Sequence, residues 1–148
     1  MLLAGALASA NAGGAETDKL VELINEYRSS PQVCDGRQTP ALGPLAPQPV
    51  LSHREIASRL DSVQDALKRA GYAAAQVQAI VLTGPASAKD ALALLKQRYC
   101  RALLSPQFAD IGIFREGNTW RILLARPLLS RALPDWREAG KEILKRTN

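Results

Sequence analysis

Two cysteines and one histidine are the residues of this chain whose types and spacing are most informative about chemistry. Cys34 and Cys100 lie too far apart for a CxxC redox motif, and His53 alone provides no cluster of zinc ligands beside them. In an oxidising compartment the two thiols would most simply form a disulfide that closes one long loop, a constraint worth about 4 kcal/mol. The alternative is a pair of unrelated thiols that are buried as small apolar side chains.

Nucleophilic and acid–base catalysis find little support in the remaining residues. No serine lies in a Gly-x-Ser-x-Gly turn, and a single histidine does not identify a Ser-His-Asp triad without positional evidence. The carboxylates show no spacing that marks a pair with separated pKa values. His53 is followed by Arg54 and Glu55, and we expect it to be a solvated residue at a helix start rather than a ligand. The sequence therefore predicts no catalytic residue and no cofactor.

The first residues have the character of an export signal. Met1 to Ala12 is a run of small and apolar residues that ends in Ala-x-Ala triplets, as a signal-peptidase site would. The segment lacks a basic start, and about ten apolar residues are too few to span a bilayer. We therefore interpret residues 1–15 as the remainder of a signal peptide, with a disordered alanine-rich leader as the alternative. The expected localisation is the periplasm, the cell surface or the medium, and no transmembrane segment is expected.

Composition narrows the choice of partners. The rest of the chain has the length and apolar content of one ordinary domain, which we expect to be a monomer. The net charge is +5, but the basic residues, Arg28 among them, are scattered, and the aromatic residues are few and unclustered. A basic solvated surface explains this charge better than a nucleic-acid interface does.

Hydrophobic periodicity predicts the helices of the first half. An amphipathic helix is predicted over residues 17–27, and four prolines within residues 39–49 predict an extended loop. Ser52 followed by Glu55 matches a capping box at the start of a second helical stripe. This stripe forms one helix or two, since Asp61 is a second candidate cap.

Shorter elements are predicted in the second half. Residues 77–82 form an apolar, β-branched run typical of a buried strand, and Ser87 with Asp90 marks the start of another helix. Residues 110–114 and 119–125 flank a Glu-Gly-Asn turn, the pattern of an antiparallel hairpin. The predicted fold class is therefore α+β, with a small antiparallel sheet covered by helices.

Five short segments share their order and spacing with one known family. They are the LVELINEYR helix of Leu20–Arg28, the Cys34-Asp35-Gly36 that follows, the stretch 44–51, the Arg69–Tyr72 turn and, most specific, the run Tyr99–Ile113. Together they resemble the CAP superfamily of cysteine-rich secretory, antigen 5 and pathogenesis-related proteins, in its compact bacterial branch, over residues 18–127. The resemblance implies an α-β-α sandwich, an exported protein and a disulfide between Cys34 and Cys100.

The family commonly has a cleft in which two histidines and one or two glutamates can hold a divalent metal, and this sequence departs from that pattern. Tyr99 stands where the family has a histidine, and Gln78 is the best match to a cleft glutamate. The loop with the second histidine is absent, because His53 resembles it only superficially and falls at a helix start. A neutral amide and a phenol with an ordinary pKa of about 10 are poor ligands for a divalent metal. We therefore predict a degenerate cleft without a metal.

These observations lead to three functional hypotheses. The favoured one is an exported, non-catalytic CAP-like domain at residues 16–127 that presents its loops and remodelled cleft to a protein, peptide or glycan. The second is a binder of a small apolar ligand, of lipid or sterol type, in a cleft lined by Gln78 and Tyr99. The third is a hydrolase with an atypical site that uses His53.

Residues 128–148 are predicted to be a C-terminal extension with an amphipathic helix over residues 134–145. This helix either docks on the sandwich or begins a second, tandem domain. The tandem alternative rests on an apolar pair and an asparagine whose spacing repeats that of the opening helix.

Overall fold

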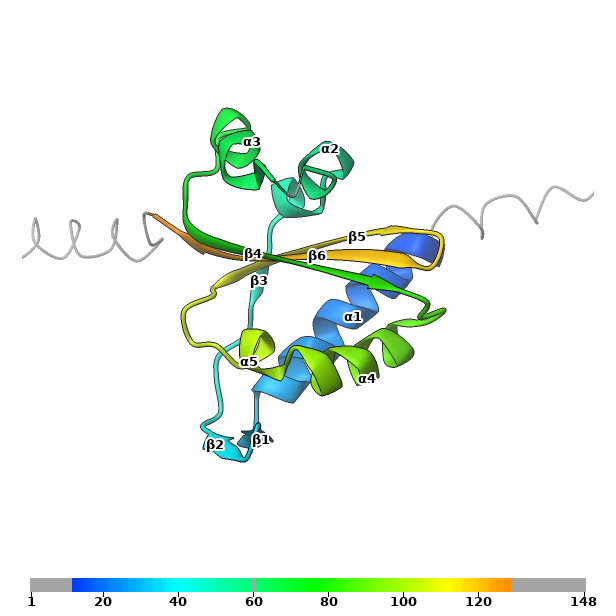
Figure 1. Cartoon of the computed structure of the whole chain (residues 1–148), viewed down its shortest axis with the longest axis vertical. Coiled ribbons are helices and arrows are strands. Elements are labelled where there is room, and N and C mark those ends of the chain that lie inside the picture. Colours follow the sequence, from blue (N-terminus) through cyan, green and yellow to red (C-terminus); the bar gives the residue numbers. More distant parts are fainter. Residues whose placement is uncertain (1–11, 60, 129–148) are drawn as a thin grey trace, which may run out of the picture.

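The computed structural model describes residues 12–59 and 61–128 (Figure 1). A long first helix leads into a small ribbon and an extended loop, and short helical segments precede the longest strand. Two further helices then precede a hairpin. The elements are α1 (Ala12–Arg28), β1 (Gln32–Cys34), β2 (Arg37–Thr39), β3 (Ala46–Pro47), the 3₁₀ helix η1 (Pro49–Ser52), α2 (Arg54–Ala57), α3 (Val63–Arg69), β4 (Ala74–Thr83), α4 (Ala88–Arg98), α5 (Cys100–Leu103), β5 (Asp110–Glu116) and β6 (Thr119–Pro127).

The main sheet has four strands in the order β3-β5-β6-β4. β4, β6 and β5 are antiparallel neighbours, and β5 with β6 forms the predicted hairpin. The first residue of their connection, Gly117, has a φ of 60°, as a type II′ turn requires. β3 pairs in parallel with the start of β5, with Ala46 opposite Asp110. The sheet thus gains one short parallel strand, which lies among the prolines that predicted only a loop.

β1 and β2 form a separate two-stranded ribbon that the sequence analysis did not predict. Asp35 and Gly36 connect the two strands with φ values of 52° and 77°, so both turn residues adopt the left-handed region, as in a type I′ hairpin. Asp-Gly is the sequence signature of this turn. The strands beside it are too short to show an alternating pattern.

Helices cover both faces of the sheet (Figure 1). α1, α4 and α5 lie on one face, which we call the lower layer, and η1, α2 and α3 lie on the other, which we call the upper layer. Side chains along β4 alternate accordingly. Ile80 and Leu82 join the larger core cluster of the lower layer, whereas Val77 and Ala79 pack against the smaller cluster of the upper layer. The predicted α+β class and the α-β-α sandwich are confirmed.

α1 is longer than the predicted helix because it begins at Ala12, within the segment interpreted as a leader. Its buried residues recur at every fourth position from Leu20 to Arg28 and therefore lie on one face. The Asn25 side chain donates to the carbonyl of Leu45 at 3.1 Å and accepts from its N–H at 2.8 Å. These two bonds fix the extended loop against the helix.

The capping box predicted at Ser52 is not formed. Pro49 starts η1, and the Ser52 hydroxyl donates to the Pro49 carbonyl instead of capping a helix. His53 occupies the N-cap position of α2 without a side-chain cap. The predicted stripe forms two helices, and the N-cap of the second is Ser62 rather than Asp61. The short η1 turn takes up the residue that the α-helix would have used as its cap.

α4 begins as predicted. The Ser87 hydroxyl accepts from the N–H of Asp90 at 3.2 Å. The N–H of Ala88 donates to the carboxylate of Glu16 in α1 at 2.8 Å. α1 therefore supplies a second, acidic cap to the N-terminus of α4, a position where the helix dipole favours negative charge.

Most of the predicted leader and the predicted helix at residues 134–145 lie outside the described residues. The description ends at Leu128, whose N–H donates to the carbonyl of Ala73 just before β4. Of the helices described, none has the length and apolar character needed to cross a bilayer.

Candidate functional site

The predicted disulfide is present. Cys34 at the end of β1 and Cys100 at the start of α5 are bonded, with an S–S distance of 1.97 Å and a Cα–Cα distance of 5.8 Å. The alternative of two unrelated buried thiols is therefore wrong. The bond ties the ribbon that follows α1 to the junction of α4 and α5. In this oxidised form neither sulfur is a nucleophile.

The bonded cysteines also lie in the one group of three metal-binding residue types that the described residues bring together. This group is Cys34, Asp35 and Cys100. Metal ligation by cysteine needs a thiolate, which a disulfide does not offer. The Asp35 carboxylate accepts from Nε of Arg101 at 2.6 Å in an exposed ion pair. Such pairs contribute about 1 kcal/mol or less, so this group is a structural junction in its oxidised state.

Arg28 connects the same region from inside the protein. Its buried guanidinium donates to the carbonyls of Gly43 (3.1 Å), Leu103 (2.7 Å) and Ser105 (3.2 Å). Burial lowers the pKa of Arg28 from its ordinary value, because it disfavours the charged form. The bonds join α1 to the proline-rich loop and to the end of α5. Composition alone places Arg28 among the scattered basic residues, but its position on the apolar stripe, four residues after Ile24, indicates burial.

The structure places the candidate site residues on two sides of the sheet. Gln78 lies in β4 on the same face as Ile80 and Leu82, and therefore faces the lower layer. Tyr99 follows α4 and packs against the core cluster of that layer, but within the described residues no hydrogen bond joins it to Gln78. His53 is exposed at the start of α2 in the upper layer. The sheet thus stands between His53 and the other two residues.

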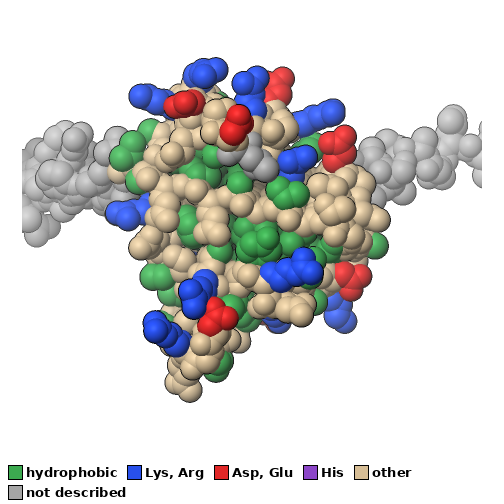
Figure 2. All heavy atoms as spheres, in the orientation of Figure 1, with side chains coloured by type: hydrophobic (Ala, Val, Ile, Leu, Met, Phe, Trp, Pro, Cys, Tyr) green, Lys and Arg blue, Asp and Glu red, His purple; other side chains and the backbone are tan. Residues whose placement is uncertain are grey.

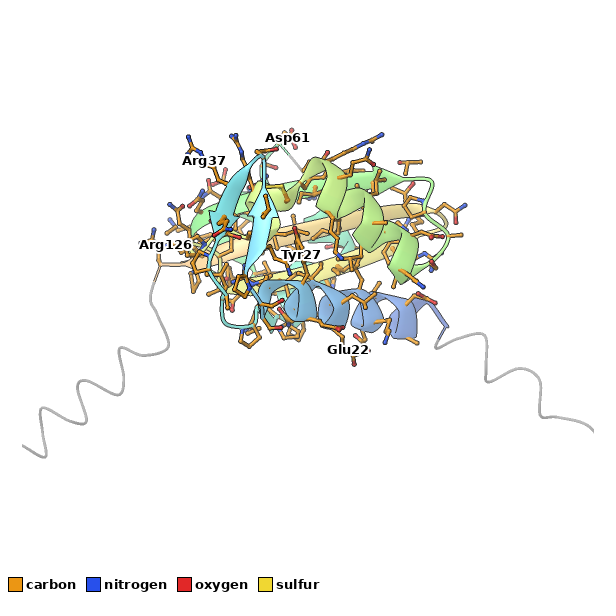
Figure 3. The ribbon with its side chains drawn as sticks, turned by 90° about the horizontal axis from the view of Figure 1, so that it is seen from below. Glu22, Tyr27, Arg37, Asp61 and Arg126 are labelled. Atoms are coloured by element: carbon orange, nitrogen blue, oxygen red, sulfur yellow. A yellow bond between two sulfur atoms is a disulfide. The ribbon has the colours of Figure 1, made fainter. Side chains whose placement is uncertain are left out.

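A groove of about 690 Å³ lies between α1 and α4. In the view from below, the two helices run side by side, with Tyr27 between them and the ribbon at one end (Figure 3). The apolar lining comes from Leu23 and Tyr27 of α1 and from Leu92 and Ala93 of α4. The two cleft residues predicted from the sequence do not line it. Because the groove forms between helices that are distant in the chain, the sequence alone gave no signal beyond the breadth of the apolar stripe of α1.

Charged side chains surround this apolar lining. Nζ of Lys96 lies 4.9 Å from the centre of the Tyr27 ring, a cation–π contact. Burial raises the pKa of the Tyr27 phenol from its ordinary value, so this group stays neutral near pH 7. The carboxylate of Glu16 is occupied by the N-terminus of α4. The arrangement suits the binding of a molecule with an apolar body, and it aligns no nucleophile with a base. The charged lining residues are Glu16, Lys19, Glu26, Lys89 and Lys96.

Comparison by sequence gives no match: no family model matches this chain, and no curated protein does. Solved structures do resemble it. A cysteine-rich secretory protein from Staphylococcus aureus subsp. aureus Mu50 has a TM-score of 0.64 at 15% identity, over 78% of this chain and 39% of that chain. An extracellular protein containing an SCP domain from Bacillus anthracis str. Ames has a TM-score of 0.58 at 15% identity, over 77% of this chain and 41% of that chain.

This chain therefore spans about two fifths of the length of either protein. The fold is a divergent CAP-like fold, as the sequence resemblance implied.

Proposed function

We propose that this chain, whose fold is CAP-like, is an exported domain that works by binding another molecule and not by catalysis. The observation that carries the proposal is the separation of its candidate chemical groups. His53 is exposed in the upper layer, Gln78 and Tyr99 belong to the lower layer, and the two cysteine sulfurs are joined to each other. A catalytic or metal centre needs several such groups around one substrate or ion.

Three further observations support export. Disulfides form and persist mainly in oxidising compartments, and this chain has one. Residues 1–12 have the composition and the Ala-x-Ala triplets of a signal-peptidase substrate. The two structurally similar proteins are described as secretory and extracellular.

The expected partner is a protein, a peptide or a glycan. The ribbon of β1 and β2 projects from the sandwich (Figure 1), and the disulfide fixes it at Cys34, beside its turn. Val33 in this ribbon has 63% of its surface exposed. A protruding segment on a rigid scaffold is the kind of feature that binding surfaces use.

A metal titration tests the non-catalytic part of the proposal. The full chain is titrated with zinc, calcium and magnesium and followed by native mass spectrometry, beside the variants His53→Ala and Tyr99→Phe. We expect no stoichiometric metal on any of the three proteins. One ion per chain that is lost in either variant would contradict the proposal, as would hydrolase activity that disappears in His53→Ala.

A second candidate function is the binding of a small apolar molecule, and the groove between α1 and α4 is the observation that favours it. Binding of a fluorescent fatty acid can be compared between Ala93→Arg and Gln97→Arg. Both variants add one arginine to an exposed position of α4, but only Ala93 lines the groove. Loss of binding in Ala93→Arg alone would support this function. Equal binding by both variants would exclude the groove as the site.

A further inference from the structure

β4 is the outermost strand of the sheet and is open on one side within the described residues. It is ten residues long and contains neither a charged residue nor a proline, and its one irregularity is confined to Ala74–Gln76. Figure 1 looks along the plane of the sheet with β4 in front. In the same orientation, hydrophobic side chains gather across the middle of this face, and most charged side chains lie above and below them (Figure 2). Sheets usually protect an open edge with charges, prolines, short strands or a cover, none of which β4 itself provides.

The register of β4 identifies the backbone groups that point outward. The N–H of Gly84 donates to the carbonyl of Asn118 at 2.9 Å, in line with the β4–β6 ladder. Residues of an antiparallel ladder alternate between those that bond to the neighbouring strand and those that face away. The even-numbered residues up to Gly84 therefore bond to β6, whereas Val77, Ala79 and Val81 direct their N–H and C=O groups to the open side. The outward groups are centred on Ala79.

We infer that this edge pairs with β4 of a second copy of the chain, antiparallel and about a two-fold axis at Ala79. In this register Ala79 faces Ala79 of the partner subunit, and Val77 faces Val81 of the partner subunit. Each outward N–H and C=O of the three residues then has a partner. Val81, which has 37% of its surface exposed, is covered by an apolar side chain. The two sheets become one continuous sheet.

Charge favours a second copy over an unrelated strand. The facing strand must place small apolar side chains at alternate positions, and β4 itself has that pattern. Two uncharged strands meet without repulsion, although the chain carries a net charge of +5. An acidic strand would find no cation on β4, because Arg121 and Arg126 lie one strand further in, on β6. The inferred dimer differs from the monomer expected from the sequence, because the order of strands in a sheet is not visible in the sequence. The inference is independent of the proposed function.

Cross-linking tests the register in the full chain. In a hydrogen-bonded antiparallel pair the Cα atoms are about 5.5 Å apart, within disulfide range, so Ala79→Cys should form a covalent dimer under oxidising conditions. Gln76→Cys is the matched control on the same strand. Its two copies would lie about 20 Å apart and should stay unlinked. Equal cross-linking of the two variants, or none by Ala79→Cys, would overturn the inference.

Solution mass gives the independent measurement. Light scattering over a wide concentration range should show a dimer for the wild-type chain. Val81→Lys should raise the dimer dissociation constant about tenfold or more, because it removes two cross-strand valine pairs at once. Val33→Lys, on the ribbon, is the control and should leave the dimer unchanged. A monomer at every concentration would overturn the inference, and so would a dimer whose dissociation constant is unchanged by Val81→Lys. Protection of the β4 amides from hydrogen exchange in a monomer would likewise overturn it, because another segment or partner would then cover the edge.

Discussion

The two layers that cover the sheet are held in different ways. The lower layer packs long helices on the larger core cluster, and the disulfide and Arg28 add links between segments that are distant in the chain. The upper layer has only short helices over a cluster of five buried residues. Its contacts with the sheet include the backbone of Leu51, which lies directly against Gly112, and the Tyr72 hydroxyl, which donates to the Asp110 carboxylate at 2.7 Å. The cluster consists of Leu51, Ile56, Leu67, Leu123 and Ala125.

The two layers should therefore contribute differently to the stability of the domain. The lower layer is connected redundantly, so it should unfold only with the whole domain. The upper layer has shorter helices and a smaller buried cluster, so it should open first, as a local unit. The following substitutions test this contrast, beginning with the largest expected effect.

Removal of the disulfide by Cys34→Ala with Cys100→Ala should lower the free energy of unfolding by about 4 kcal/mol, because the loop that the bond closes is long. Denaturant unfolding followed by circular dichroism measures the change. Arg101→Ala is the control, since it removes only the neighbouring exposed ion pair and should cost about 1 kcal/mol or less. A double variant as stable as this control would show that the bond does not hold the lower layer.

Gly112→Ala should lower the free energy of unfolding by about 3 kcal/mol. A Cβ at this position would overlap the backbone of Leu51, so η1 must shift away from the sheet. Hydrogen exchange should show faster opening of the upper layer than of α1 and α4. Gly43→Ala is the control, because its added Cβ meets nothing within 4 Å. Equal destabilisation of both layers would contradict the expectation that the upper layer opens before the lower layer.

Arg28→Met should cost about 2 kcal/mol, because three carbonyls lose a charged donor inside the protein while the apolar volume is kept. Thermal unfolding measures the loss, which should appear as one cooperative transition at a lower temperature. Arg37→Met changes an exposed arginine of the ribbon and should be nearly neutral. If amides of α2 and α3 alone lost protection from hydrogen exchange, Arg28 would not act in the lower layer, contrary to this prediction.

Tyr72→Phe should give the smallest effect, about 1.5 kcal/mol, because it removes the hydroxyl that donates to Asp110. The expected readout is increased proteolysis within α2 and α3 with little change in the lower layer. Tyr99→Phe offers the comparison in the lower layer. Among the described residues its hydroxyl makes no hydrogen bond to another side chain or backbone group, so this substitution should be neutral. Equal effects of the two substitutions would show that the hydrogen bond from Tyr72 to Asp110 does not stabilise the upper layer in particular.

Much of the lower layer could be predicted from the sequence. α1 and α4 have long apolar stripes, Ser87 and Asp90 form a local cap, and Gly117 supplies the turn that the hairpin needs. All of these signals act over a few residues, where propensity and turn chemistry decide the structure. The pairing of Cys34 with Cys100 followed from the family resemblance together with the small number of cysteines.

The upper layer and the site could not be predicted in the same way. β3 is two residues long and exists only because β5 lies beside it, and the start of α2 is displaced by the η1 turn. The groove depends on the contact of α1 with α4, and the open edge depends on the strand order. These features come from tertiary arrangement, which leaves no periodic trace in the sequence.

We propose that this chain is an exported, disulfide-linked binding domain, and the redox state of its cysteines in living cells is the most direct test of that proposal. Free thiols are alkylated in intact cells that produce the full chain, and each cell fraction is then examined by intact mass spectrometry. We predict that the chain lies outside the cytoplasm with neither Cys34 nor Cys100 alkylated. A cytoplasmic chain with both cysteines alkylated would contradict the account.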